Sequence, residues 1–356
     1  MYQYSHGGNA AFESGQEIKL DLSANINPLG LPDKVSAAIV SQIPNLTSYP
    51  DNSSGALRDA ISEFENVDSR WIFCGNGASD IIFRIPRVVQ GKKAMLTAPT
   101  FSDYERALQS YGADIAYYTL VADNSFTITD EFISAVEREK PNLVYICNPN
   151  NPTGRLTDAS IIGELLVRCP ETVFAIDECF LDFTMEASMH TSKRFLGQHQ
   201  NIIILKAFTK MFTMPGIRLG YSLCSNESFN DNLYFHGPDW PVSNLAQGAG
   251  IAALEGADEF VKRTASYVAI EREQVERSLI EYGFRIFESS TNYVFLQSPF
   301  EFDLQEELNK HGIRIRSCNN YHGLDNSYFR IAVTTKENNA TLLSAIETIT
   351  AQKRFI

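Results

Sequence analysis

Short apolar segments alternate with segments of helical periodicity along most of this 356-residue chain, and this alternation restricts the fold more than any other feature. Fully apolar strands separated by helices are typical of a mostly parallel sheet that is covered on both faces. The sequence therefore predicts an α/β fold. The expected strands are Trp71–Cys74, Ala94–Thr97, Ile115–Leu120, Leu143–Cys147, Val173–Ile176 and Ile202–Leu205. The expected helices are Pro32–Ile43, a helix ending near Glu65, Ala78–Val88, Tyr104–Tyr111, Asp130–Glu139 and Asp158–Arg168.

The pattern changes near Asp239, which suggests a second domain. A long helical region, Ala249–Tyr282, is interrupted near Gly256 and precedes shorter strand-like and helical segments. We expect an N-terminal arm over residues 1–30 that packs with the small domain, a large domain over 31–238 and a smaller α+β domain over 239–356. The remaining expected elements are the strands Ile18–Leu22, Tyr293–Leu296, Ile313–Ile315 and Tyr328–Val333 and the helix Leu304–His311.

Polar or turn-forming residues follow four of the predicted strands. They are Gly75–Ser79, Asn148–Gly154, Asp177-Glu178 and the segment that leads to Lys210. Ligands of open α/β sheets bind beyond the carboxyl ends of the strands, so these four clusters should meet at one edge of the sheet.

The segment Ile204–Tyr221 carries a lysine and an arginine on either side of a Pro-Gly pair. Lys210 has apolar neighbours, and desolvation would lower its pKa and make its amine a nucleophile toward an aldehyde. Arg218 could grip a phosphate with its forked guanidinium. The pair suits pyridoxal phosphate, although a surface lysine and a surface arginine in an amphipathic segment would give the same pattern.

The other clusters allow both a functional and a structural interpretation. The N–H groups of Gly75–Ser79 can bind a phosphate at a helix N-terminus, or the glycines can form a simple turn. Asp177 can pair with a pyridine nitrogen or cap a turn, and Asn151 can donate to a phenolic oxygen. Phe101 can stack on a ring or belong to the core, and the Tyr49 hydroxyl can reach a phosphate or pack in a turn.

Composition excludes several classes of function. The formal charge of −13 and the pI near 5.0 argue against nucleic acid and anionic membranes as partners. The six cysteines form no CxxC pair, which favours free thiols over metal ligands or disulfides. The N-terminus has no secretory signal and no apolar run is long enough to span a membrane, so we expect a cytoplasmic protein without a metal.

Four motifs in this order carry a resemblance that spans nearly the whole chain. They are GNGA (Gly75–Ala78), NPNNPTG (Asn148–Gly154), IDE (Ile176–Glu178) and TKxxxxPGxRxGY (Thr209–Tyr221). With them the chain resembles the fold type I pyridoxal-phosphate enzymes of the class I/II aminotransferase superfamily. The segments HGGN (His6–Asn9), DLSANINPLG (Asp21–Gly30), DECFLDF (Asp177–Phe183), Asp239–Asn244 and IRSCNNYHGL (Ile315–Leu324) with YFRIAV (Tyr328–Val333) are most similar to the threonine-phosphate decarboxylase family of cobalamin biosynthesis, a relative of histidinol-phosphate aminotransferase.

The resemblance implies a role for each motif residue. Lys210 would form the Schiff base with pyridoxal 5'-phosphate, Asp177 would pair with the pyridine and Asn151 with the phenolic oxygen. Tyr49 would reach the partner's site, so the active unit would be a homodimer. The phosphate and ring contacts would come from Gly77, Ala78, Ser79, Thr209, Arg218 and Phe101, and the substrate contacts from Arg330 (α-carboxylate), Arg316, His6 and Asn27 (phosphate).

Two residues depart from the pattern of the aminotransferases. Ala207 stands where relatives often have a hydroxyl, which removes one phosphate contact, and Phe180 replaces a tyrosine. The sequence favours decarboxylation of O-phospho-L-threonine to (R)-1-aminopropan-2-ol phosphate. Histidinol-phosphate transamination and phosphoserine decarboxylation remain alternatives, because a pocket discriminates a methyl group by only about 1–3 kcal/mol. A ligand-sensing protein of the same fold is the least supported alternative.

Overall fold

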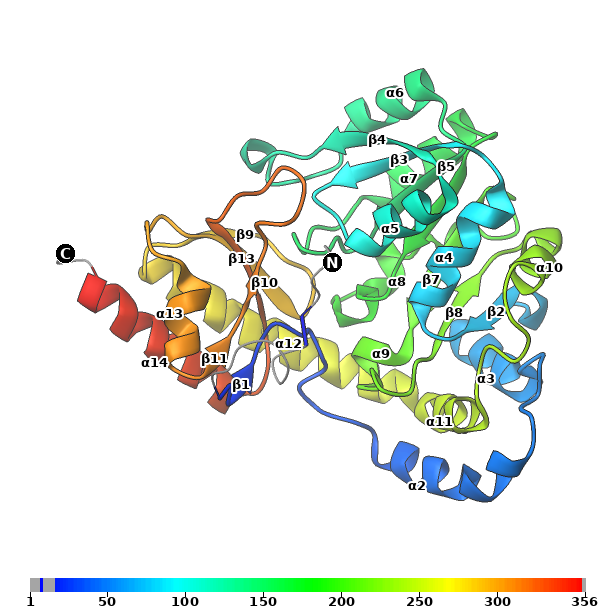
Figure 1. The fold of residues 1–356 in the computed structure, drawn as a ribbon, viewed down its shortest axis with the longest axis horizontal. Coiled ribbons are helices and arrows are strands. Elements are labelled where there is room, and N and C mark those ends of the chain that lie inside the picture. The colour runs from blue at the N-terminus through cyan, green and yellow to red at the C-terminus, as the bar shows by residue number, and fades with distance from the viewer. Residues whose placement is uncertain (1–6, 9–16, 354–356) are drawn as a thin grey trace.

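A seven-stranded sheet forms the centre of the larger of two domains in the computed structural model, which describes residues 7–8 and 17–353 (Figure 1). Its strand order is β2-β8-β7-β6-β5-β3-β4. Every neighbouring pair is parallel except the two that β8 forms with β2 and β7. The α/β prediction is therefore confirmed. The strands are β2 (Ile72–Gly75), β3 (Lys93–Ala98), β4 (Asp114–Thr119), β5 (Leu143–Cys147), β6 (Val173–Asp177), β7 (Ile202–Ala207) and β8 (Gly220–Leu223).

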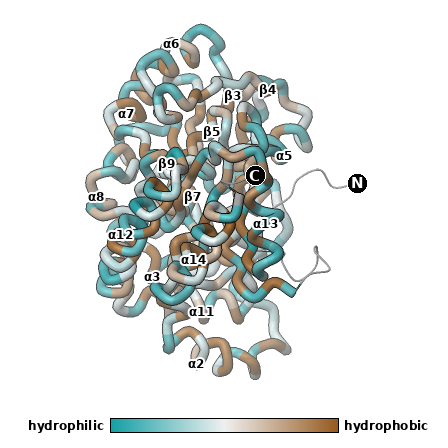
Figure 2. The backbone as a smooth tube through the Cα atoms, turned by 90° about the vertical axis from the view of Figure 1, so that its left-hand side faces the viewer, coloured by the Kyte–Doolittle hydropathy of each residue, from teal (hydrophilic) through white to brown (hydrophobic). Residues whose placement is uncertain are grey.

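Helices cover both faces of this sheet, because alternate strand residues point to opposite sides. On β7, Ile203 and Leu205 pack in a core that includes residues of α4 (Ala78–Val89), α5 (Ser102–Tyr111) and α10 (Glu227–Phe235). Ile202 and Ile204 pack in the core of the other face. The helices that contribute to that core include α2 (Asp33–Gln42), α3 (Gly55–Glu65), α6 (Asp130–Glu139), α7 (Ala159–Arg168) and α11 (Asn244–Leu254). Figure 2 shows the apolar β5 and β7 inside the molecule.

Local residues explain where several helices begin and end. Asp158 precedes α7, and its carboxylate accepts a hydrogen bond of 2.8 Å from the Ser160 N–H, which satisfies a free donor at the helix start. Gly112 follows α5 with φ of 76°, a conformation that suits glycine at a helix end. The shorter helical segments are η1 (Ile43–Thr47), η2 (Ser69–Trp71), η3 (Ala122–Asn124), η4 (Leu181–Phe183), α8 (Ala187–His190), η5 (Ser192–Phe195) and α9 (Phe208–Met211).

The smaller domain contains an antiparallel sheet of order β12-β13-β10-β9. The helices α12 (Ala257–Glu281), α13 (Leu304–Lys310) and α14 (Lys336–Lys353) accompany it, and its own apolar core is separate from the cores of the large domain. A two-stranded parallel pair, β1 with β11, ties the N-terminal segment to this domain. The strands are β1 (Leu20–Asp21), β9 (Arg285–Phe287), β10 (Tyr293–Gln297), β11 (Ile313–Arg314), β12 (Arg316–Ser317) and β13 (Tyr328–Ala332).

The structure also contains elements that the sequence pattern did not predict, which include β8, β9, β12, α8, α9, α10 and α14. Helix α11 packs against α2 and α3 of the large domain, although it lies beyond residue 238. The predicted domain bounds stay predictions, but α12 is the first helix of the region that contacts the sheet of the small domain.

All six cysteines are free thiols, and all except the partly exposed Cys179 are buried. Across the described residues, no helix combines the length and the apolar character that a membrane span requires.

Candidate active site

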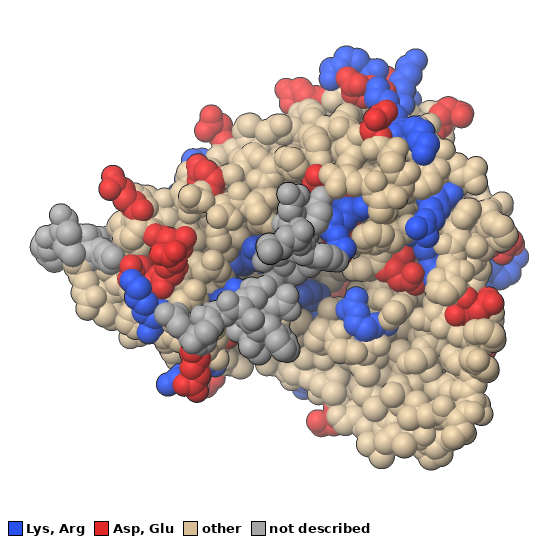
Figure 3. Space-filling view, in the orientation of Figure 1, with Lys and Arg blue, Asp and Glu red and all other residues tan. Residues whose placement is uncertain are grey.

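A cavity of about 320 Å³ lies between the two domains, beyond the carboxyl ends of β3, β5, β6 and β7. Its volume is in the range of ordinary small-molecule sites. Figure 3 shows basic side chains gathered around the hollow at the centre of this face. Of the predicted site residues, the cavity is lined by Ala78, Ser79, Phe101, Asn151, Asp177, Thr209, Lys210, Arg218, Arg316 and Arg330.

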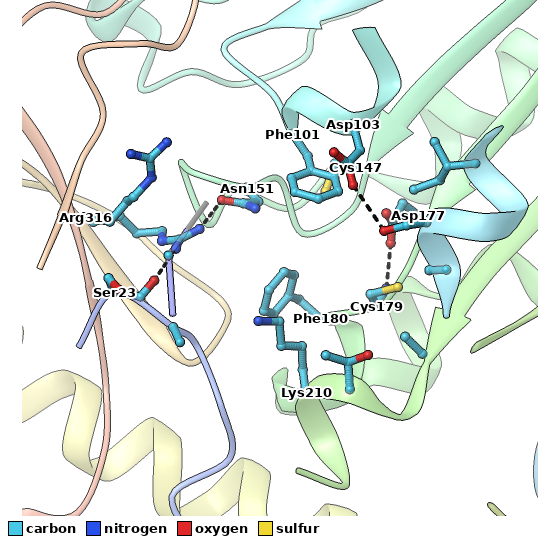
Figure 4. A pocket seen from close by; sticks show the side chains of 18 of the residues that line it. Ser23, Phe101, Asp103, Cys147, Asn151, Asp177, Cys179, Phe180, Lys210 and Arg316 are labelled. Atoms are coloured by element: carbon cyan, nitrogen blue, oxygen red, sulfur yellow. Dashed lines mark hydrogen bonds between the residues drawn. The ribbon is translucent and has the colours of Figure 1, made fainter. Parts of the chain in front are cut away.

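Lys210 extends into this cavity from the short helix α9, directly after β7 (Figure 4). Burial, together with the positive charges of Arg330 and Arg218, lowers the pKa of its amine to about 8. The Nζ atom lies 5.9 Å from the centre of the Phe180 ring. A substantial fraction of the amine is therefore neutral near pH 8, which a nucleophile toward an aldehyde requires.

Asp177 ends strand β6 at the side of the cavity away from Arg316 (Figure 4). Its Oδ2 accepts a hydrogen bond of 2.7 Å from the Tyr104 hydroxyl, and its Oδ1 accepts one of 3.0 Å from the Cys179 N–H. Burial raises the pKa of this carboxyl, while the two hydrogen bonds oppose that shift. A carboxylate held in this way can pair with a cationic ring nitrogen.

The loop between β2 and α4 has the shape of an anion cradle. Gly77 has φ of 81°, which suits a residue without a side chain, and a Cβ there would stand 2.8 Å from Nη2 of Arg218. Gly220 of β8 approaches the loop so closely that a Cβ would lie 2.4 Å from the Ala78 nitrogen. The first N–H groups of α4 have no partner inside the helix, and Ala78 and Ser79 line the cavity.

Ser79 uses its hydroxyl elsewhere. The Ser79 Oγ donates to Asp103 Oδ2 at 3.1 Å, and Asp103 also forms an ion pair of 3.0 Å with Arg106. The backbone N–H of Ser79 is therefore the group of this residue that can bind an anion. Ala207 lines the cavity with a methyl group, so the missing hydroxyl noted in the sequence falls within the site.

Arg330 on β13 is held by two acceptors from distant parts of the chain. Its Nη2 donates to the Ser23 carbonyl at 2.7 Å, and its Nη1 donates to Oδ1 of Asn151. Because Oδ1 of Asn151 is thus engaged as an acceptor, its Nδ2 is the group that can donate to a ligand. The structure therefore couples the arginine predicted for the substrate to the amide predicted for the cofactor (Figure 4).

Arg316 lies beside Arg330, since the two residues are paired in the register of β12 and β13. Its Nη2 donates to Asn320 Oδ1 at 2.8 Å, and its guanidinium lies 5.5 Å from the centre of the Tyr321 ring. Two neighbouring arginines therefore line one end of the cavity, where they can bind two anionic groups of one ligand.

Four predicted residues are not among those that line the cavity: Gly77, which belongs to the adjoining cradle loop, and Tyr49, His6 and Asn27. Tyr49 is 80% exposed and stacks on Trp240 at 4.5 Å, so it is not part of the site of its own chain. His6 is not among the described residues. Asn27 does not line the cavity, because its Nδ2 donates to the Met211 carbonyl at 2.7 Å and to Thr264 Oγ1 at 3.0 Å, and its Oδ1 accepts from the Leu29 N–H.

Sequence reasoning missed three residues near the cavity, namely Ser23, Tyr104 and Asn25. Ser23 accepts a hydrogen bond from Arg330 through its backbone carbonyl, which every residue type has, so the sequence cannot identify this position. Tyr104 on α5 donates a hydrogen bond to Asp177. Asn25 is 1% exposed, and neither of its amide atoms has a partner among the described residues. Asn25 is the chain neighbour of the cavity-lining Ala24, and the NxN spacing of Asn25 and Asn27 is the sequence signal that could have drawn attention to this loop.

The residues present fit pyridoxal 5'-phosphate. The cavity combines an amine of lowered pKa, a buried carboxylate, an amide donor and a glycine cradle backed by an arginine. These four kinds of group correspond to the aldehyde, the ring nitrogen, the phenolic oxygen and the phosphate of that cofactor.

Comparison with known proteins gives consistent matches. The family model described as aminotransferase class I and II matches residues 17–346. The threonine-phosphate decarboxylase of Salmonella typhimurium is 31% identical, with 98% of this chain and 97% of that protein covered. The histidinol-phosphate aminotransferase of Ruminiclostridium cellulolyticum is also 31% identical, with 95% and 94% covered. A solved structure of histidinol-phosphate aminotransferase from Sinorhizobium meliloti, in complex with pyridoxal-5'-phosphate, has the same fold with a TM-score of 0.86, at 21% identity, with 98% of this chain and 95% of that chain covered.

Proposed function

Because this chain belongs to the aminotransferase class I and II family of pyridoxal-phosphate enzymes, we propose that it decarboxylates O-phospho-L-threonine. The proposed product is (R)-1-aminopropan-2-ol phosphate, an intermediate of cobalamin biosynthesis. The similarity to the threonine-phosphate decarboxylase of Salmonella typhimurium, which covers nearly the full length of both chains, supports this choice.

The pairing of Arg316 with Arg330 carries the proposal. O-phospho-L-threonine has two anionic groups, a carboxylate and a phosphate, and the two arginines are cross-strand partners that both line the cavity. L-histidinol phosphate has a phosphate and no carboxylate. Forked guanidinium groups bind either anion in a bidentate manner, so two arginines suit a ligand with both anions.

The cofactor residues have separate proposed roles. Lys210 would hold the aldehyde carbon, Asp177 would pair with the ring nitrogen, and Asn151 would donate its Nδ2 to the phenolic oxygen. Gly77, Ala78 and Arg218 would hold the phosphate, with support from Ser79 and Thr209, and Phe101 would stack on the ring. When bound, pyridoxal 5'-phosphate supplies an electron sink for the bond that breaks at the substrate's Cα.

Orientation decides which bond breaks. Arg330, fixed by Ser23 and Asn151, sets the direction of the substrate carboxylate, and Arg316 holds the phosphate. Once the carboxylate has left as CO₂, Cα needs a proton, and Lys210 in its ammonium form is the cavity group with a pKa suited to donate it and become a neutral amine. Phe180 offers no hydroxyl beside Lys210, in contrast to the tyrosine of many aminotransferases.

Tyr49 supports a homodimeric active unit. Its aromatic ring and that of Trp240 are exposed on one surface, near the exposed apolar residues Ile43 and Leu46. A second copy of the chain that covers this surface could receive the Tyr49 hydroxyl at its own cofactor phosphate.

The test compares substrates with one preparation of holoenzyme. We expect CO₂ and 1-aminopropan-2-ol phosphate from O-phospho-L-threonine, and slower turnover of O-phospho-L-serine, which lacks one methyl group. Glutamate formed from 2-oxoglutarate would indicate a transaminase, and its appearance with L-histidinol phosphate, without CO₂ from phosphothreonine, would replace our proposal by the aminotransferase.

A further inference from the structure

Arg84 is a buried cation on the helix that begins at the proposed phosphate cradle. It lies on α4, and 3% of its side chain is exposed. Burying a guanidinium is unfavourable unless carboxylates and hydrogen bonds compensate for its lost hydration. Arg84 does not line the cavity, so it would not contact a ligand there. Its hydrogen-bond partners therefore indicate its structural role.

One side of Arg84 is connected to the cradle by a carboxylate. The Arg84 Nε donates to Asp80 Oδ1 at 2.8 Å, one helical turn earlier. The other oxygen, Oδ2 of Asp80, accepts a hydrogen bond of 3.1 Å from the Asn76 N–H. A Cβ on Gly75 would lie 3.0 Å from that same oxygen, so the carboxylate fits against the turn that forms the cradle.

The other side of Arg84 is anchored to the end of α10. Its Nη1 donates to the Leu233 carbonyl at 2.8 Å, and its carbon Cζ lies 5.2 Å from the centre of the Phe73 ring on β2. The guanidinium occupies the space beside Gly237, where a Cβ would stand 1.7 Å from Nη1. Among the described residues, Nη2 has no hydrogen-bond partner, so the burial of this cation is only partly compensated.

We propose that Arg84 is a positioning residue for the phosphate cradle. It fixes Asp80, which holds the Asn76 N–H, so that the Gly75–Gly77 turn keeps the first N–H groups of α4 directed at the cofactor phosphate. The guanidinium thereby joins the cradle to the segment after α10. Arg84 does not touch the cofactor. This role of Arg84 rests on the proposed function of the cradle as the phosphate site. Arg84 lies outside the GNGA motif (Gly75–Ala78) that forms the cradle.

The experiment compares two ligands that differ by the phosphate alone. Apoprotein of the wild type, R84M, R84K and R87M is titrated with pyridoxal 5'-phosphate and with pyridoxal, and binding is followed by absorbance and by quenching of tryptophan fluorescence. We expect R84M to weaken pyridoxal 5'-phosphate binding about tenfold and to leave pyridoxal binding unchanged, because the cradle contacts the phosphate. R84K should not restore binding, because an ammonium cannot reproduce the fork. R87M, at an exposed site on the same helix, should match the wild type.

The D80N variant tests the same connection if R84M does not fold, which thermal unfolding of the apoprotein would reveal. It keeps the shape of Asp80 but weakens both of its hydrogen bonds, so it should show the same selective loss. Equal losses for both ligands, or no loss in either variant, would overturn the inference. Wild-type protein that binds both ligands equally well would instead contradict the cradle itself, so the two failures are distinguishable.

Discussion

The Tyr104 hydroxyl donates a hydrogen bond of 2.7 Å to Oδ2 of Asp177, and both side chains are buried. This bond favours the ionised carboxylate, whose pKa burial raises. We expect Y104F to raise the pKa of Asp177 further and to weaken pyridoxal 5'-phosphate binding by roughly tenfold in an apoprotein titration. Y145F is a matched control, because Tyr145 stacks on Tyr104 at 4.8 Å while its hydroxyl donates to the Ile82 carbonyl. Equal effects of the two substitutions would contradict this role.

Lys210 should make cofactor loading depend on pH. Because its folded-state pKa is lowered from 10.5 to about 8, the neutral amine increases as pH rises through about 8. The loading rate of apoprotein with pyridoxal 5'-phosphate should therefore increase from pH 6 to 9 and reach a plateau above the midpoint, as stopped-flow absorbance can measure. A midpoint near that of a solvated lysine would show that the amine is not buried in the cavity.

Substitutions of Arg316 and Arg330 should have different effects on a substrate with a phosphate and on one without it. R316Q should raise the KM for O-phospho-L-threonine roughly 100-fold and leave the binding of L-threonine unchanged, because charge-assisted hydrogen bonds to one anion are lost. R330Q should weaken the binding of both amino acids. Initial-rate kinetics give the KM for O-phospho-L-threonine, and spectral titration of the holoenzyme gives the dissociation constant of L-threonine. If R316Q weakens phosphothreonine and threonine equally, Arg316 does not bind the phosphate.

Tyr49 should act in the partner's site. In a hybrid dimer of one K210A chain and one Y49F chain, a shared arrangement leaves one site with both Lys210 and Tyr49 intact. The hybrid should therefore bind one equivalent of pyridoxal 5'-phosphate with wild-type affinity, measured after separation by two affinity tags. If the only site with Lys210 binds as weakly as the Y49F homodimer does, Tyr49 serves its own chain.

The fold and most of the candidate site could be predicted because residue type alone carries the necessary information. Fully apolar strands indicated the parallel sheet, and the rule that ligands bind at the strand ends placed Asp177, Asn151 and Lys210 in one cavity. The resemblance to the class I/II aminotransferase superfamily is confirmed by the family match over residues 17–346.

Other features could not be predicted, for physical reasons. The carbonyl that holds Arg330 belongs to Ser23, but any residue would supply it, so the sequence does not identify the position. Asn27 has the right chemistry for a ligand, but tertiary contacts with Met211 and Thr264 occupy its amide. Strand β8 contains Gly220, a residue that weakens strand propensity and that is explained only by the close approach of the cradle.

If this site removes the carboxylate of a phosphorylated amino acid, the carboxyl carbon must leave as CO₂. Carboxyl-labelled O-phospho-L-threonine, incubated with holoenzyme and with the K210A variant, tests this loss. We predict one labelled CO₂ for each 1-aminopropan-2-ol phosphate formed by the wild type and none from K210A. Retention of the label in a 2-oxo acid, with the amino group transferred to the cofactor, would show transamination instead of decarboxylation.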